Sequence, residues 1–244
     1  MPLYKPQILI ANDESAFAHL AADTFLKMAA GQARPLVTLP TGMTPLGLYQ
    51  LLVSEHAARR DLWDQMRFIA LDEYAGLPPD DERLFGNWLA RTCLDPLHIS
   101  NRLMFNSLAD PDVEAVRVEA WLKQNGPLDI AVLGIGGNGH VAFNEPGTAF
   151  AQGTHAVTLT LDTISANARY WGGPNRVPRH GITLGLQNLA AARQTLLLVH
   201  GAAKADILKR ALSGPVTTDV PASYLQTVPH VTVIADRAAA LSIA

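Results

Sequence analysis

A histidine and a glutamate stand five residues apart in a glycine-rich stretch that follows an apolar run. The stretch is Gly134–Gly147, and the two residues are His140 and Glu145. An imidazole exchanges protons near neutral pH, and a neighbouring carboxylate can set its orientation and charge. A lone histidine is more often structural. The pairing with a carboxylate after several glycines favours proton-transfer chemistry.

Two further carboxylates follow another apolar run. Asp72 and Glu73 come directly after Phe68–Leu71, and the next loop contains Pro78 and Pro79. One or both carboxylates could act as a general base, held in place by the stiff loop. The alternative is a carboxylate that caps a turn or a helix.

A third position combines small residues with hydroxyl groups. Thr41, Gly42, Met43 and Thr44 come after an apolar run and before Pro45. Proline suits the first turn of a helix. The backbone N–H groups of such a loop and of the helix that follows favour an anion. A helix-capping turn without a ligand is the alternative.

Two cations could complete an anion site. Lys204 lies at the start of a predicted helix, where carboxylates are normally preferred, and Arg169 is the second candidate. A phosphate near the helix start would explain the lysine. Each residue taken alone could also be an ordinary solvated surface charge.

Short apolar runs alternate with amphipathic segments along the chain. The predicted strands are Ile8–Ala11, Leu36–Leu39, Phe68–Leu71, Ile130–Leu133, Leu196–Val199 and Val231–Ile234. The predicted helices are Ser15–Ala30, Pro45–Ala58, Glu114–Gln124 and Ala203–Leu212. Unbroken apolar runs are typical of strands covered on both faces. The rhythm predicts an α/β fold with a doubly wound, mostly parallel, Rossmann-like sheet. Ligands bind at the carboxyl ends of such strands, where all these polar groups fall.

The chain of 244 residues contains no repeat or low-complexity linker, so we expect one domain over residues 1–244. The least regular part is residues 148–180, which contains Gly172, Gly173 and Pro178. We predict that this segment forms a flap over the site. An ordinary surface excursion is the alternative.

Composition excludes several functions. The formal net charge of −3 provides no field for nucleic acid or anionic membranes. Cys93 is the only cysteine, so no intrachain disulfide forms, and its apolar neighbours predict a buried, inert thiol. No stretch resembles a signal peptide or a membrane helix of about 20 apolar residues. We therefore expect a cytoplasmic protein without nucleic-acid or membrane partners. The scattered histidines predict no metal site.

The glycine-rich stretch formally matches the dinucleotide signature G-x-G-x-x-G over residues 134–139. That signature requires a helix to open at the third glycine. Pro146 and Gly147 arrive within eight residues of Gly139, so a helix of useful length cannot form. A dinucleotide cofactor is therefore not expected.

Several segments together carry a family likeness. They are residues 39–45 (LPTGMTP), 71–77 (LDEYAGL) and 138–147 (NGHVAFNEPG), with weaker matches at Asp162, Thr163, Asn167, Arg169, Gly201 and Lys204. In this order they resemble the glucosamine-6-phosphate deaminases, whose superfamily includes 6-phosphogluconolactonases. The lactonases instead carry Asp-Glu-Arg after the third strand and an Asp-Gly-His-Thr-Ala-Ser run. Neither occurs in this chain.

The resemblance implies conversion of glucosamine-6-phosphate to fructose-6-phosphate and ammonia, or of the galacto epimer to tagatose-6-phosphate. It implies no cofactor. Asp72 would move a proton from C2 to C1 of the open-chain sugar. His140 would open the ring, with Glu145 and Asn138 setting its orientation and protonation.

The same resemblance implies that the phosphate sits on the Thr41–Thr44 loop, with Arg169 and Lys204. Many relatives carry Asp where this chain has Asn138. Longer relatives have a C-terminal extension and basic residues that bind an allosteric activator, which are missing here, so we expect a monomer or small homo-oligomer. A lactonase-type hydrolase and a sugar-phosphate-sensing regulator are the rival functions.

Overall fold

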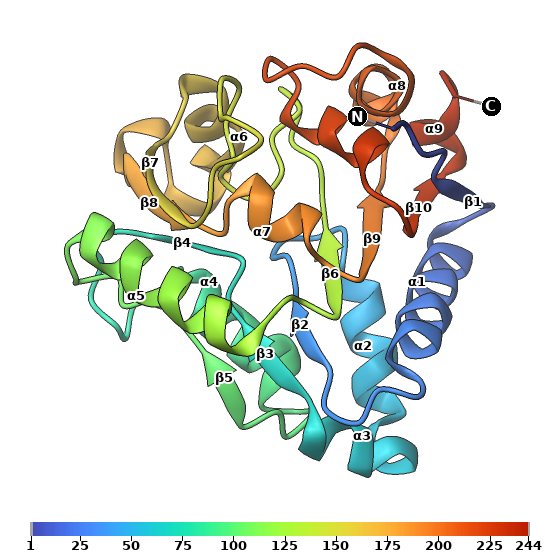
Figure 1. Ribbon diagram of the computed structural model, residues 1–244, viewed down its shortest axis with the longest axis horizontal. Coiled ribbons are helices and arrows are strands. Elements are labelled where there is room, and N and C mark those ends of the chain that lie inside the picture. Colours follow the sequence, from blue (N-terminus) through green and yellow to red (C-terminus); the bar gives the residue numbers. More distant parts are fainter. Residues whose placement is uncertain (1, 244) are drawn as a thin grey trace.

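The central sheet of the computed structural model, which describes residues 2–243, contains seven parallel strands (Figure 1). In spatial order they are β1 (Gln7–Ala11), β10 (Val231–Asp236), β9 (Gln194–Val199), β6 (Ile130–Leu133), β2 (Leu36–Thr38), β3 (Arg67–Ile69) and β5 (Asn101–Leu103). All six predicted strands lie in this sheet, so the predicted doubly wound parallel sheet is confirmed. The short strand β5 was not predicted, because Asn101–Leu103 has only three residues and contains no apolar run.

The chain reverses its direction of travel across the sheet between β2 and β6. From β2 it proceeds outward through β3 to β5, then returns to β6 and proceeds the other way through β9 to β10. Loops that leave the carboxyl ends of β2 and β6 therefore diverge and leave a crevice between them.

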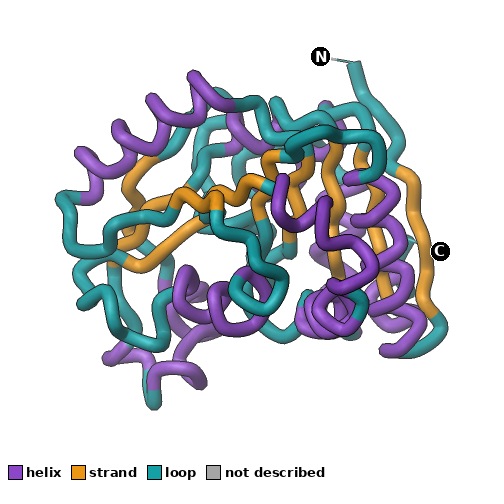
Figure 2. The backbone as a smooth tube through the Cα atoms, turned by 90° about the horizontal axis from the view of Figure 1, so that it is seen from below, coloured by secondary structure: helices purple, strands orange, loops and turns teal. Residues whose placement is uncertain are grey.

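Helices cover both sides of the strands (Figure 2). They are α1 (Glu14–Ala29), α2 (Leu46–Ser54), α3 (Arg60–Gln65), α4 (Phe85–Leu89), α5 (Pro111–Asn125), α6 (Leu161–Trp171), α7 (Leu186–Ala190), α8 (Ala205–Ser213) and α9 (Arg237–Ala240). Short 3-10 helices occupy His56–Arg59, Pro174–Arg176, Ala202–Lys204 and Pro221–Thr227, and a π-helical turn occupies Ala90–Leu94. The four predicted helices match α1, α2 with its following turn, α5, and α8 with its preceding turn. Asp13 caps α1 by accepting a hydrogen bond from the N–H of Ala16 over 2.8 Å.

A second, antiparallel sheet stands beside the first. Its strands are β4 (Asp72–Tyr74), β8 (His180–Thr183) and β7 (His155–Thr158), in that order. Residues 148–180, the least regular part of the sequence, contain β7 and α6. Thr160 caps α6 and Gly172 ends it in the left-handed conformation at φ 69°. Both are recognisable helix boundaries.

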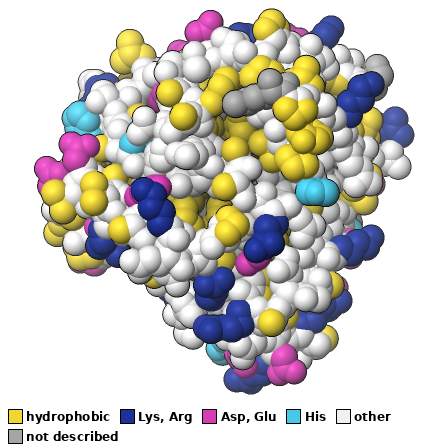
Figure 3. All heavy atoms as spheres, in the orientation of Figure 1, with side chains coloured by type: hydrophobic (Ala, Val, Ile, Leu, Met, Phe, Trp, Pro, Cys, Tyr) yellow, Lys and Arg dark blue, Asp and Glu magenta, His cyan; other side chains and the backbone are white. Residues whose placement is uncertain are grey.

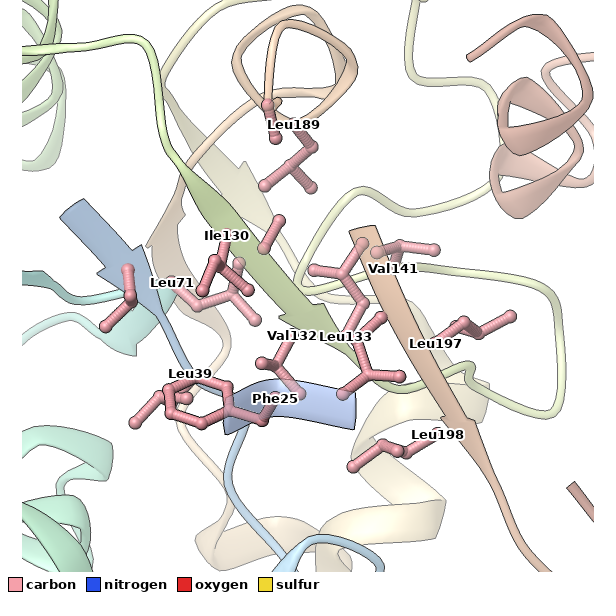
Figure 4. Close-up of a cluster of buried hydrophobic side chains, with 14 of the residues drawn as sticks. Phe25, Leu39, Leu71, Ile130, Val132, Leu133, Val141, Leu189, Leu197 and Leu198 are labelled. Atoms are coloured by element: carbon pink, nitrogen blue, oxygen red, sulfur yellow. The ribbon is translucent and has the colours of Figure 1, made fainter. Parts of the chain in front are cut away.

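The core lies on both sides of β6 and β9 (Figure 4). Leu133 and Leu197 are fully buried between the helices, and Phe25 of α1 packs into the same cluster. Cys93 is buried, as predicted. No helix within residues 2–243 is long and apolar enough to cross a membrane. Acidic and basic side chains are both spread over the face in Figure 3.

Candidate functional site

A cavity of about 480 Å³ lies at the carboxyl edge of the parallel sheet, beside α6. Its lining includes eight of the ten residues predicted from the sequence: Thr41, Gly42, Met43, Thr44, Asp72, His140, Arg169 and Lys204. The other two, Asn138 and Glu145, are not part of the lining but contact His140. The fold thus brings together segments that are up to about 160 residues apart in the chain, as expected for loops at one sheet edge.

His140 is held against its own glycine-rich loop. A Cβ atom at Gly136 would overlap the imidazole ring, so only glycine allows this packing. The Oδ1 atom of Asn138 accepts a hydrogen bond from the backbone N–H of His140 over 3.1 Å. Nδ1 of His140 lies 3.6 Å from Oε2 of Glu145. The ring is therefore fixed from its loop side, and it lines the cavity.

Glu145 is 5% exposed and accepts several hydrogen bonds. Its Oε2 atom accepts from Nδ2 of Asn138 over 3.0 Å and from the hydroxyl of Thr160 over 3.1 Å. Burial alone would raise the pKa of this carboxyl. The contacts with His140, Thr163 and Thr160 outweigh burial and hold the pKa at about 2. Glu145 is therefore an anion at any physiological pH.

The neighbouring carboxylates Asp72 and Glu73 have different surroundings. Adjacent residues in a strand point to opposite faces, and here only Asp72 lines the cavity. Glu73 accepts the backbone N–H groups of Tyr74, Phe85 and Gly86 at 2.8–2.9 Å, which ties β4 to the start of α4. The structure thus separates the two roles that the sequence left open: one carboxylate faces the cavity and the other is a helix-end anchor.

Burial dominates the acidity of both groups. It raises the pKa of Asp72 well above its ordinary value, and the charge of Glu73 adds to the rise. Burial also raises the pKa of Glu73 to about 7, although the three backbone N–H groups oppose it. Within residues 2–243, no group donates a hydrogen bond to the side chain of Asp72. A carboxylate that the protein does not stabilise by hydrogen bonds is a strong proton acceptor.

The Thr41–Thr44 loop connects β2 to α2. Gly42 has φ 99°, which L side chains rarely adopt, and the hydroxyl of Tyr49 in α2 donates to the carbonyl of Pro40 over 2.6 Å. Pro45 is the cap of α2 instead of its first helical residue. Met43 is 64% exposed.

The two predicted cations are held differently. Lys204 caps α8, and its Nζ donates to the carbonyl of Ile135 over 2.8 Å. Burial lowers the pKa of Lys204. Arg169 is exposed on α6, where its guanidinium donates to the hydroxyl of Tyr170 over 2.7 Å and stacks on that ring. Lys204 is therefore held by the protein backbone, whereas Arg169 is held by the neighbouring side chain of Tyr170.

Several side chains at the site lay outside the predicted set. Thr160 and Thr163 reach Glu145 and His140 from α6. The spacing Thr-x-x-Thr at the start of a helical segment is a signal that could have predicted Thr160 as the N-terminal cap of a helix. Arg83 stacks over the ring of Trp171 at 4.2 Å, and both line the cavity. No local signal in the sequence pairs these two, since 88 residues separate them.

The parallel sheet, with a cavity at its carboxyl edge, places the protein among the doubly wound α/β enzymes. Residues 12–234 match the model of the family described as glucosamine-6-phosphate isomerases/6-phosphogluconolactonase, and the chain belongs to this family. It is 39% identical over 240 residues to glucosamine-6-phosphate deaminase of Lactobacillus delbrueckii subsp. bulgaricus, covering 96% of this chain and 98% of the relative. It is 37% identical to glucosamine-6-phosphate deaminase 2 of Bacillus subtilis, covering 96% of each chain.

Solved structures agree with the family. A monomeric glucosamine-6-phosphate deaminase superposes with a TM-score of 0.92 at 33% identity, covering 97% of this chain and 99% of that one. The 6-phosphogluconolactonase from Trypanosoma brucei superposes with a TM-score of 0.79 at 19% identity, covering 99% and 100%. The second similarity shows a shared fold alone.

Proposed function

We propose that the protein is an isomerising aminosugar-6-phosphate deaminase, which converts glucosamine-6-phosphate or its galacto epimer to a ketose-6-phosphate and ammonia. One observation carries the proposal. The buried carboxylate of Asp72 and the imidazole of His140 face one cavity, whose rim is the Thr41–Thr44 loop. The names of relatives at 36–39% identity support the same activity.

Ring opening is the first step. His140 takes the proton from the hydroxyl on C1 and delivers a proton to the ring oxygen, while the bond from C1 to that oxygen breaks and the C1 carbonyl forms. The imidazole ends the step as it began. The carboxylate of Glu145 lies beside Nδ1 of His140 as an acceptor for the ring. Asn138 supports that carboxylate by donating a hydrogen bond to it.

Isomerisation and deamination follow. Asp72 removes the proton from C2 and returns it at C1, while the C1 oxygen gains a proton and the amine nitrogen loses one, so that C1 becomes a hydroxymethyl group and C2 a ketimine. Water adds to C2 and ammonia leaves, which yields the ketose. Burial raises the pKa of Asp72 and so strengthens it as the base for a carbon acid.

The phosphate binds where the Thr41–Thr44 loop lines the cavity. The backbone N–H groups of residues 41–44 and the start of α2 favour an anion. Lys204 uses one proton on the carbonyl of Ile135 and retains two for phosphate oxygens. Arg169 supplies a second positive charge from α6. These contacts make the phosphorylated sugar the substrate and leave the free sugar poorly bound.

The wider setting belongs to the same proposal. The protein acts in the cytoplasm as a monomer or small homo-oligomer, and a solved relative is described as monomeric. Residues 1–244 act as one domain, in which the segment 148–180 is a flap that brings α6 over the cavity. A lactonase-type hydrolase and a sugar-phosphate sensor are the weaker alternatives.

The experiment is to measure ammonia release from glucosamine-6-phosphate and from galactosamine-6-phosphate, and hydrolysis of 6-phosphogluconolactone in parallel. We expect ammonia from at least one aminosugar phosphate and no faster lactone hydrolysis than in buffer. The ratio of kcat/KM for the two epimers identifies the substrate. Lactone hydrolysis without ammonia release would overturn the proposal, and binding without turnover would indicate a sensor.

A further inference from the structure

We propose that Thr160 and Thr163 of α6 form a hydroxyl relay, which holds the neutral imidazole of His140 with its proton on Nδ1. The inference rests on the proposed function and assigns two positioning residues to it. Neither threonine needs to touch the sugar. Their role is to leave Nε2 of His140 without a proton, so that it can accept one.

The contacts run in a chain from the imidazole to the carboxylate. Oγ1 of Thr163 lies 3.2 Å from Nδ1 of His140 and 3.4 Å from Oγ1 of Thr160. Oγ1 of Thr160 lies 3.1 Å from Oε2 of Glu145. The direct separation from Nδ1 to Oε2 is longer, at 3.6 Å. Thr163 is 1% exposed, so water does not compete for its hydroxyl.

The carboxylate determines the direction of every bond in this chain. An ionised Glu145 can only accept, so the hydroxyl of Thr160 must donate to it. Thr160 then has only lone pairs left for Thr163. The side chain of Thr163 also contacts Glu145, so its hydroxyl proton is directed toward Glu145 or Thr160 and not toward His140. The oxygen of Thr163 can then only accept from Nδ1. His140 is therefore the donor at Nδ1, and the neutral ring has no proton on Nε2.

The same helix carries both the relay and a substrate contact. Thr160 caps α6, Thr163 lies in its first turn, and Arg169 lies in its last turn. Asn167 and Tyr170 of this helix also line the cavity. The position of α6 therefore governs phosphate binding and the tautomer of His140 together. Displacement of α6 would break the chain of hydroxyl groups that connects His140 to Glu145.

The kinetic test compares Thr163→Val with Thr163→Ser. Valine keeps the shape but removes the hydroxyl, so kcat should fall on the order of tenfold to a hundredfold with KM little changed. Serine keeps the hydroxyl and should restore most of kcat. Thr158→Val is the matched control, because the hydroxyl of Thr158 lies 3.3 Å from Nδ1 of His180, outside the cavity. It should behave as the parent protein.

The second readout does not depend on activity. Nitrogen NMR of isotope-labelled histidine side chains at alkaline pH should show the proton of His140 on Nδ1 in the parent and in Thr163→Ser. His140→Asn identifies the signal. In Thr163→Val the ring should shift toward the tautomer protonated on Nε2, which free imidazole side chains prefer.

Two results would overturn the relay. One is a proton on Nε2 of His140 in the parent protein, and the other is unchanged kcat and tautomer in a folded Thr163→Val. Failure of the proposed function looks different, because the parent itself would then release no ammonia from either aminosugar phosphate. The tautomer measurement decides the relay in that case as well.

Discussion

The side-chain amide of Asn138 donates a hydrogen bond to Oε2 of Glu145 over 3.0 Å, while its oxygen accepts the backbone N–H of His140 over 3.1 Å. Residue 138 therefore serves as donor and acceptor at once. An aspartate could accept from the backbone, but it would place a second acceptor-only group against Glu145 unless one of the pair held a proton. The neutral amide removes that conflict.

Asn138→Asp should therefore destabilise the fold in a pH-dependent way. Two carboxylates in contact raise one pKa of the pair above its unfolded value, so the loss is full at neutral pH and disappears on acidification below the unfolded value. We expect a loss of about 1.5–3 kcal/mol at neutral pH, the scale of a hydrogen bond to a charged group. Denaturant unfolding at neutral and acidic pH measures it.

The control for this substitution is the double variant Asn138→Asp with Glu145→Gln. The glutamine amide can donate to the new aspartate, so part of the lost stability should return. Equal unfolding free energies for the parent and Asn138→Asp across the pH range would show that the two side chains do not meet in solution.

Asp72→Asn should abolish the carbon-acid chemistry while leaving substrate binding intact. An amide of the same shape cannot take the C2 proton, so kcat should fall by roughly 10²–10⁴-fold. Steady-state ammonia release and substrate binding by calorimetry measure the two effects separately. Near-normal turnover would remove Asp72 from the mechanism.

Glu73 should affect stability through its pKa. Burial raises that pKa from 4.5 to about 7, so the unfolded chain loses its proton first as the pH rises. The contribution of Glu73 to the free energy of unfolding therefore falls progressively as the pH rises from about 4.5 to 7. Above pH 7 this contribution stays constant at its lowest value. Glu73→Gln should flatten the pH dependence of unfolding in this window.

Glu73→Gln should also lose one hydrogen bond, because its NH₂ group cannot accept the N–H of Gly86 that Oε2 accepts over 2.8 Å. At acidic pH, where Glu73 is protonated in both the folded and the unfolded chain, this loss should leave the variant less stable than the parent. Unfolding free energies of the parent and of Glu73→Gln at several pH values separate the loss of the hydrogen bond from the change in pH dependence. An unchanged slope would show that another buried acid, such as Asp72, causes the pH dependence.

Lys204→Ala should raise KM more than Arg169→Ala. Lys204 is already positioned by its hydrogen bond to Ile135, whereas Arg169 is exposed and stacked on Tyr170. A charge-assisted hydrogen bond is worth on the order of 1.5–3 kcal/mol, or about a tenfold to hundredfold change in KM. Lys209→Ala, an exposed lysine on α8, is the matched control. Equal activity on unphosphorylated glucosamine would contradict both assignments.

The sequence by itself determined the parallel sheet and the place of the site. Short unbroken apolar runs such as Ile130–Leu133 are typical of strands buried on both faces, and the polar segments follow their carboxyl ends. The anion loop at residues 41–44, the acid at Asp72 and the imidazole at His140 could therefore be predicted to meet. No tertiary information was needed, because parallel strands bring those ends to one edge.

Only the tertiary structure decided which side chain faces the cavity. The pairing of β4 with β8, with Asp72 opposite Thr183, sends Asp72 to the cavity and leaves Glu73 to anchor α4. The position of α6 above the site brings Thr163 to His140, which lies 23 residues earlier in the chain. Local sequence specifies the period of a strand and the cap of a helix. The face that a strand presents and the neighbour that a helix meets depend on long-range packing, which no short motif encodes.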